Sequence, residues 1–527
     1  MPQATDFFSI SKEIANRYLQ SIIFVDERAY EQEAPEAGNN HYFPTKRVSA
    51  AFSKNQKICS IIAPTSVREF DEYSNSLFKK SDVLVLDWYL KFDEEVVVNE
   101  EEDADDNIEG KHTLRCLKGI AEDAGTEKLR LILIYTSRDQ LERISGEILS
   151  ALSIFDYKKS GYCIESPSKN VKILIRIKDD DNEHQGEMAE YKLSPEQLPS
   201  FILDEFTLMT MGLIPNYALS CISQIRENSS KILWVMSKDL DAPFMCHKLS
   251  IPNKDDANEL ITECFASLLE CLLSNNSNII NDWEEPWANA IINAHRNVEL
   301  VTGCEIDIDV DFVKKVLLSK KDTLRKRLNE ALPIGKKIKD ENELEAPDNI
   351  IKLFIDDADY ARGVKDKFAT FVQRRNLVKT LDNVPMLTLG SVVKDENTNK
   401  YFLCIQQSCD SIRVKQPRKF LFLPLSEKVN GKEQPCIIVD SGLHLFVDLK
   451  SYNLTQYVLK PDEESKTIRA VQDGNNQYVF EVINQQYLRW ICDIKKTLAL
   501  RIVNQYTSQL SRVGVDQPEW VRLSELT

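Results

Sequence analysis

Residues 83–90 read VLVLDWYL, and the kind of sheet expected in this protein follows from them. Val83–Leu86 is a short apolar run of the kind found in strands buried on both faces, and Asp87 ends it. Similar runs rich in Ile, Val and Leu occupy 21–25, 58–62, 131–135 and 173–177, with polar, helix-compatible stretches between them. This alternation predicts an α/β domain whose five-stranded parallel sheet is covered by helices on both faces.

Polar side chains follow four of the five runs directly. They are Asp26 and Glu27 after the first run, Asp87 after the third, Thr136 and Ser137 after the fourth, and Lys178 after the fifth. Ligands of open parallel sheets bind beyond the carboxyl ends of the strands, where the strand order reverses. With the order 2-1-3-4-5, these four strands are neighbours. We therefore expect three carboxylates, a hydroxyl and an ammonium to meet in one pocket.

The three carboxylates predict a metal site. Carboxylates held close together repel one another unless a cation is present. Oxygen ligands that leave room for water suit Mg²⁺. We expect Asp26, Glu27 and Asp87 to hold Mg²⁺, together with a backbone carbonyl near Tyr89.

The same pocket suits phosphoryl transfer. A carboxylate can attack phosphorus and form an acyl phosphate, and the central Asp87 is the expected nucleophile. Thr136 would donate a hydrogen bond to the phosphoryl group, and Lys178 would pair with its charge. An aspartate at a strand end is often only a helix cap, so the prediction depends on the whole set of residues.

The rest of the chain changes character twice. We expect an α/β domain at 1–195, a helical region at 196–384 and a small antiparallel β domain with a closing helix at 385–527. Expected strands in the last part are 386–393, 401–405, 420–423, 436–439, 443–447 and 478–483, with hairpin signals at Asn430-Gly431, Ser441-Gly442 and Asp473-Gly474. The closing helix is predicted from one apolar stripe, Tyr487, Ile491, Ile494, Leu498, Ile502, Tyr506 and Leu510.

Composition narrows the function classes. The chain has 527 residues, a net charge of −17 and 12 cysteines without a CxxC pair. Apolar runs are far shorter than the about 20 residues that span a bilayer, and the start resembles no signal peptide. We expect a cytoplasmic protein with no membrane partner, for which nucleic acid is a poor partner because acidic chains repel phosphate.

Residues 91–110 are strongly acidic and residues 314–339 strongly basic. We favour solvated segments for both.

Taken together, the segments FVDE (24–27), VLVLDWYL, LILIYTS (131–137) and ILIRIK (173–178) resemble the receiver domain of two-component response regulators. The resemblance implies a flavodoxin-like fold, phosphorylation of Asp87 by a partner histidine kinase, and Mg²⁺ as cofactor. Two positions depart from the family's pattern. Asp179 follows Lys178 where the family has proline, and Ile175 stands where it has an aromatic switch residue.

Further segments resemble a narrower group, the large divergent response-receiver proteins of bacterial phage-defence operons. They are MGLIPNYALSCISQIREN (211–228), Cys246-His247, FLCIQQSCDSIRV (402–414) and FLPL (422–425). This resemblance implies a phosphate sink that drains a histidine kinase and so prevents accidental activation of a toxic effector. A second receiver or effector of the same system would be a further partner.

Three alternatives remain open from the sequence. The chain could be a phosphorylation-gated protein that binds another protein, or nucleic acid through Arg325, Lys326 and Arg327. It could also be a pseudo-receiver scaffold that accepts no phosphate. Cys404, Cys409, Cys436 and His444 suggest a zinc site, although buried structural cysteines fit the predicted strands better. No glycine-rich phosphate loop is present, and we do not expect an enzyme.

Overall fold

The computed structural model describes most of the chain. The described residues are 6–30, 43–92, 109–124, 128–179, 188–251, 254–274, 279–291, 296–301, 304–317, 350–355, 357–375, 377, 384–427, 435–439, 442–450, 453–483 and 486–510. The chain divides into two compact units, one of residues 1–296 and 308–327, the other of residues 297–307 and 328–527. The three-part division expected from the sequence stays a prediction.

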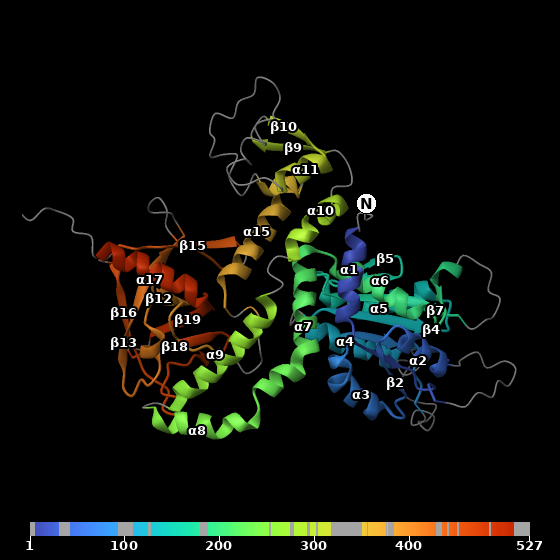
Figure 1. Ribbon diagram of the computed structural model, residues 1–527, viewed down its shortest axis with the longest axis horizontal. Coiled ribbons are helices and arrows are strands. Elements are labelled where there is room, and N and C mark those ends of the chain that lie inside the picture. Colours follow the sequence, from blue (N-terminus) through green and yellow to red (C-terminus); the bar gives the residue numbers. More distant parts are fainter. Residues whose placement is uncertain are drawn as a thin grey trace, which may run out of the picture. The chain divides into compact units, whose positions relative to one another are not determined.

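The first unit contains the predicted parallel sheet (Figure 1). Five parallel strands lie in the order β2 (Ile58–Ile62), β1 (Ser21–Val25), β3 (Val83–Leu86), β4 (Arg130–Thr136) and β7 (Val171–Lys178). Each of the five apolar runs is therefore a strand, and the order 2-1-3-4-5 is confirmed.

Three short strands extend the sheet beyond β7, and the sequence did not predict them. β6 (Cys163–Glu165) pairs antiparallel with β7, and β5 (Lys158–Ser160) pairs with β6. β8 (Lys192–Leu193) pairs parallel with the last two residues of β7.

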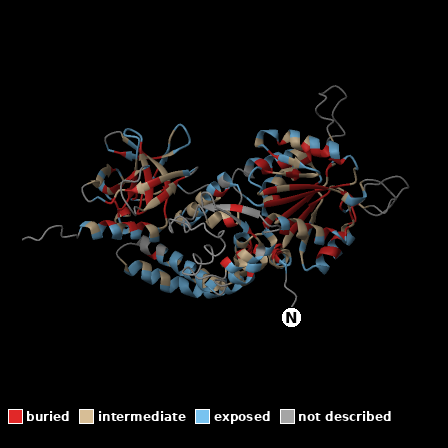
Figure 2. Cartoon of the chain, turned by 90° about the horizontal axis from the view of Figure 1, so that it is seen from above, coloured by how far each residue is buried: buried red, intermediate tan, exposed pale blue. Residues whose placement is uncertain are grey.

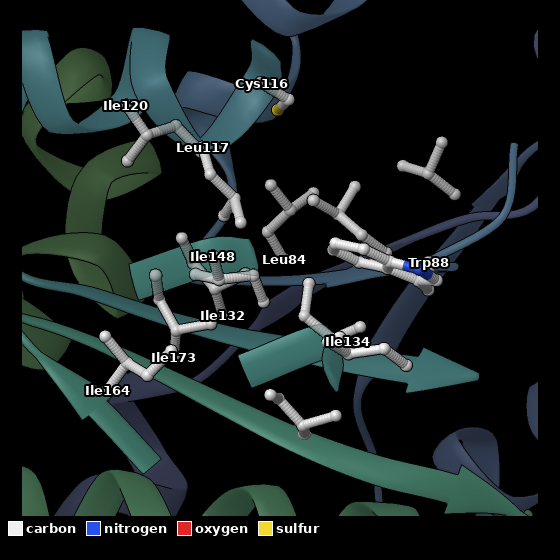
Figure 3. Packing of buried hydrophobic residues seen from close by; sticks show 14 of the residues in the cluster. Leu84, Trp88, Cys116, Leu117, Ile120, Ile132, Ile134, Ile148, Ile164 and Ile173 are labelled. Atoms are coloured by element: carbon white, nitrogen blue, oxygen red, sulfur yellow. The ribbon is translucent and has the colours of Figure 1, made fainter. Parts of the chain in front are cut away.

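Each face of the sheet has its own core, because side chains alternate along a strand. On one face, Leu84, Ile132, Ile134 and Ile173 pack under α3 (Val67–Ser76), α4 (Lys111–Ala124) and α5 (Leu141–Ala151), as Figure 3 shows in part. On the other face, the alternate residues of the same strands pack under α1 (Phe7–Tyr18), α2 (Thr45–Lys54), α6 (Leu198–Thr210) and α7 (Leu213–Val235). The four parallel strands β1, β3, β4 and β7 are accordingly buried almost throughout, whereas the edge strand β2 is partly exposed (Figure 2).

The helix α7 is fastened to the sheet by charged contacts as well. Arg226 donates to Asp82 at 3.0 Å, and Arg17 of α1 pairs with Glu227 at 2.8 Å. Asp82 is 5% exposed and also accepts from the backbone of Gln20 and Ser21. The helix α7, at least as far as Glu227, thus belongs to the same folded body as the sheet.

Where the structure describes it, the predicted helical region is largely helical and also contains a small sheet. It contains α6, α7, α8 (Asp241–Ser250), α9 (Lys254–Leu273), α10 (Ile279–Ile291), α11 (Val310–Leu317) and α15 (Ala358–Gln373). Between α10 and α11, β9 (Arg296–Val301) and β10 (Cys304–Ile308) form a two-stranded sheet. Every helix among the described residues is too short or too polar to cross a membrane.

The second unit contains the predicted antiparallel β domain. Its strands are β11 (Ser391–Asp395), β12 (Lys400–Cys404), β13 (Arg418–Ser426), β14 (Cys436–Val439), β15 (Leu443–Val447), β16 (Thr455–Leu459), β17 (Val471–Gln472), β18 (Tyr478–Val482) and β19 (Gln486–Asp493). The order β12-β11-β19-β18-β16-β13 closes on itself because β13 also pairs with β12. One core, with Phe420, Phe422 and Phe480, belongs to this ring, and a second lies under α17 (Lys496–Leu510).

The predicted start of the closing helix is wrong. Residues 486–493 form β19 between β11 and β18, and α17 begins only at Lys496. Tyr487 and Ile491 fit a helical stripe, but their segment QYLRWICD also carries the aromatic and β-branched residues that suit strands. Pairing with two neighbouring strands decided between the patterns. β16 was not predicted either.

Candidate functional site

Three of the predicted site residues, Asp26, Asp87 and Lys178, lie on the same face of the parallel sheet at the carboxyl ends of its strands. Asp26 and Asp87 each extend the hydrogen-bond ladder by one residue, since Asp26 N donates to Ile62 O at 3.1 Å and Asp87 N to Val25 O at 3.0 Å. By the alternation of side chains, both lie on the face covered by α1, α2, α6 and α7, as does Lys178. The end of the sheet therefore brings them together.

Lys178 joins the two aspartates. Its Nζ donates to Asp26 Oδ2 at 2.6 Å and to Asp87 Oδ2 at 2.6 Å. All three side chains are nearly buried, with exposed fractions of 5% for Lys178, 4% for Asp26 and 13% for Asp87. A buried charge of this kind is tolerated only when it is paired and hydrogen-bonded.

Glu27 lies beside this group without a full set of partners. Its Oε1 is 3.7 Å from Nε of Arg28, and its buried Oε2 has no hydrogen-bond partner among the described residues. Burial, followed by the charges of Asp87 and Asp26, raises the pKa of Glu27 to about 8. The site thus holds a carboxyl group whose ionisation is costly, because Arg28 is its only close cationic partner among the described residues and lies 3.7 Å away.

The pKa values of Asp87 and Lys178 are both raised, for reasons that lie in their surroundings. Burial raises the pKa of Asp87, and the ammonium of Lys178 opposes that rise. Burial alone would lower the pKa of Lys178, but Asp87 and Asp26 outweigh it and raise that pKa. Lys178 is therefore charged at every pH near neutrality.

The three carboxylates fit a divalent cation. Asp26, Glu27 and Asp87 each offer an oxygen, and these atoms lie within 4.8 Å of one another. When all are ionised, the ammonium of Lys178 leaves two negative charges uncompensated. Together with the partnerless Glu27 Oε2, this donor set suits Mg²⁺, which prefers carboxylate oxygens and retained water. The backbone N–H of Tyr89 donates to Asp87 Oδ1 at 3.3 Å, and a role for its carbonyl stays a prediction.

Thr136 is the last residue of β4, and its side chain is buried. By the alternation of side chains, it lies on the other face of the sheet from Lys178. Its Oγ1 accepts a hydrogen bond from Arg138 N at 3.2 Å. The roles predicted for Thr136, and for the other site residues, stay predictions.

The structure adds neighbours that the sequence did not indicate. Thr113 Oγ1 donates to the backbone carbonyl of Asp87 at 2.8 Å. The rings of Phe43 and Tyr135 lie beside Lys178 Nζ, with centroids at 5.4 and 5.9 Å. Tyr135 directly precedes Thr136, so its place in the strand was available from the sequence. Phe43 precedes α2 and carries no such signal.

The zinc alternative finds no support among the described residues. Asp26, Glu27 and Asp87 are the group of three or more metal-type ligands found there. Cys404 is buried in β12, Cys409 is exposed, and His444 Nε2 is 3.0 Å from Asp366 Oδ1. Most of the acidic segment (93–108) and most of the basic one, including Arg325, Lys326 and Arg327, lie outside the described residues.

Comparison with known proteins agrees with this geometry. Residues 18–183 match the family model of the response receiver domain. The matched receiver segment runs from before β1 to beyond β7, so it includes all five parallel strands and every predicted site residue. No curated protein and no solved structure matches the chain. The receiver match supports a phosphoryl-accepting protein of a two-component system.

Proposed function

We propose that this chain accepts a phosphoryl group on Asp87 from a partner histidine kinase and serves as a phosphate sink in a phage-defence signalling system. The observation that carries the proposal is Lys178 bridging Asp26 and Asp87 at 2.6 Å, with Glu27 beside them, at the carboxyl end of a receiver-like sheet. The defence role rests on the sequence resemblance alone.

The chemistry is a displacement at phosphorus. A carboxylate oxygen of Asp87 forms the new O–P bond while the P–N bond of the donor phosphohistidine breaks, and the leaving imidazole takes up a proton. Lys178 remains charged and donates to the phosphoryl oxygens, as does the hydroxyl of Thr136. Mg²⁺ held by Asp26, Glu27 and Asp87 would supply further positive charge against those oxygens.

The remaining parts of the chain are proposed to be non-catalytic. No glycine-rich phosphate loop occurs in the sequence, so phosphate would come from outside the chain. In a sink, the receiver needs to compete for the kinase's phosphoryl group and needs no catalytic output. We place the protein in the cytoplasm, where its partner kinase would present its phosphohistidine.

Phosphorylation by acetyl phosphate tests the first step. We expect acid-stable, hydroxylamine-labile labelling that requires Mg²⁺ and is absent in Asp87→Asn. Asp139→Asn is the matched control, because Asp139 is an exposed carboxylate near the same end of the sheet. Labelling that survives in Asp87→Asn would refute Asp87 as acceptor. No labelling of the wild type, even by the purified kinase, would favour the pseudo-receiver scaffold.

Competition tests the sink. The phosphorylated partner kinase is mixed with a second receiver of its system, with and without this chain. We expect the chain to lower the label on the second receiver, and Asp87→Asn to leave it unchanged. Equal label in both mixtures would leave phosphoryl acceptance intact but exclude the sink.

A further inference from the structure

Lys178 sits in a pocket with two different walls. The carboxylates of Asp26 and Asp87 form one wall, each accepting from Nζ at 2.6 Å. The rings of Phe43 and Tyr135 form the other, with centroids 5.4 and 5.9 Å from Nζ. Phe43 is 2% exposed and Tyr135 is 1% exposed. Both rings thus lie within the range of cation–π attraction and are themselves almost fully buried.

The ring of Tyr135 is fixed relative to the backbone of Lys178. The Tyr135 hydroxyl donates to Leu193 O at 2.8 Å, and Asp179 N donates to the same oxygen at 3.1 Å. Leu193 is also the partner of Lys178 in the pairing of β7 with β8. One carbonyl therefore ties the ring, the strand end that bears Lys178, and β8 together.

This tie lies where the chain departs from the receiver pattern, since Asp179 occupies the position after the lysine. Unlike proline, Asp179 has a backbone N–H, and that N–H makes the bond to Leu193 O. A lysine side chain has four flexible bonds, so the end of its strand and its surroundings must fix the ammonium.

We propose that Phe43 and Tyr135 are positioning residues for Lys178, holding its ammonium against the Asp26–Asp87 pair. The expected effect on the rate of phosphoryl transfer rests on the proposed function. The expected effect on the position of the ammonium does not. Without the rings, the ammonium samples other positions, and phosphoryl transfer to Asp87 slows.

The fold offers a matched control. Phe43 and Phe52 both pack on Phe24, with ring centroids at 5.9 and 5.4 Å, and both are almost fully buried. Of these two rings, only that of Phe43 lies beside Lys178. Replacing either by leucine removes a ring from the same core, and only one replacement alters the surroundings of the ammonium.

The first readout is the rate of Asp87 labelling by acetyl phosphate, measured with saturating Mg²⁺. We expect Phe43→Leu and Tyr135→Leu to lower the rate constant about tenfold, and Phe52→Leu to change it less than about twofold. Tyr135→Phe, which keeps the ring, retains more of the rate than Tyr135→Leu. Mg²⁺ affinity stays within about threefold, because the carboxylates remain. Equal loss of rate in Phe43→Leu and Phe52→Leu would overturn the proposal.

The second readout does not need phosphorylation. Acetic anhydride acetylates accessible lysine amines, and peptide mass mapping then gives the rate at Lys178. We expect that rate to rise about tenfold in Phe43→Leu, because an ammonium that leaves the two aspartates loses the charges that keep it protonated, and to stay near the wild-type value in Phe52→Leu. The wild type could accept no phosphate while acetylation of Lys178 is faster in Phe43→Leu and unchanged in Phe52→Leu. In that case the proposed function fails and the positioning role holds. Equal protection of Lys178 in both variants refutes the positioning role.

Discussion

At the scale of single residues, the site balances charge among side chains that are nearly buried. Lys178 compensates one of the three carboxylates that meet at the end of the sheet. Burial and the neighbouring aspartates make ionisation of Glu27 costly, which its raised pKa reflects. The effects of pH, Mg²⁺ and substitution should follow from this unequal balance.

Stability without Mg²⁺ should fall as pH rises. The pKa of Glu27 is about 8 in the folded protein, against an ordinary value of 4.5, so the folded state keeps a proton that the unfolded chain has released. We expect urea unfolding to show about 2–4 kcal/mol less stability near pH 9 than near pH 5 from this group. Glu27→Gln should flatten the slope, whereas Glu122→Gln, an exposed control on α4, should not. An unchanged slope in Glu27→Gln would contradict the assignment.

Removal of the ammonium should be costly in the absence of metal. Lys178→Met leaves Asp26 and Asp87 buried without their shared cation, which should lower the free energy of unfolding by about 3–5 kcal/mol. Mg²⁺ should recover part of that loss. Chemical unfolding with and without Mg²⁺ measures both effects, and Lys158→Met at an exposed position of β5 serves as control. Equal stability of the two variants would exclude a shared buried charge.

At the scale of elements, the connections around the sheet set the positions of the functional groups. β8 holds the end of β7 at Lys178, and the turn before α4 packs against Trp88, the residue after Asp87. These short contacts fix where the strand ends point. Neither follows from the apolar pattern of the strands.

Gly110 allows the close contact before α4. Its φ is +85°, and a Cβ there would lie 2.4 Å from the Trp88 ring. We expect Gly110→Ala to destabilise the protein by about 2–4 kcal/mol. Gly119 lies inside α4 with open space around it, so Gly119→Ala should instead stabilise the protein by about 0.5–1 kcal/mol. Thermal unfolding of both variants checks the contrast, which would be refuted by effects of the same sign.

At the scale of the whole molecule, the chain forms two compact units, each with its own cores. Within the first, Arg226 of α7 reaches the buried Asp82 that precedes β3. The part of the chain after the receiver segment therefore contributes to that unit's stability.

Arg226→Met should weaken the first unit in particular. The loss leaves Asp82 with only its bonds from the Gln20–Ser21 segment, and we expect about 1–2 kcal/mol of destabilisation. Hydrogen exchange read by mass spectrometry should show faster exchange in peptides from β1 and β3 and unchanged exchange in β11–β13. Arg68→Met on the exposed face of α3 is the control. Faster exchange in both units alike would contradict independent cores.

The sequence alone determined the parallel strands and the polar residues that follow them, whereas their order was an assumption taken from flavodoxin-like sheets that the structure confirmed. Apolar strands of fixed length and polar residues at their ends are local patterns, and the geometry of parallel sheets converts them into one site. Tertiary structure alone decided that residues 486–493 form β19, that β8 ties Lys178, and that Phe43 reaches the ammonium. These outcomes depend on pairing and packing between segments far apart in the chain, where the partner, more than the local pattern, selects the conformation.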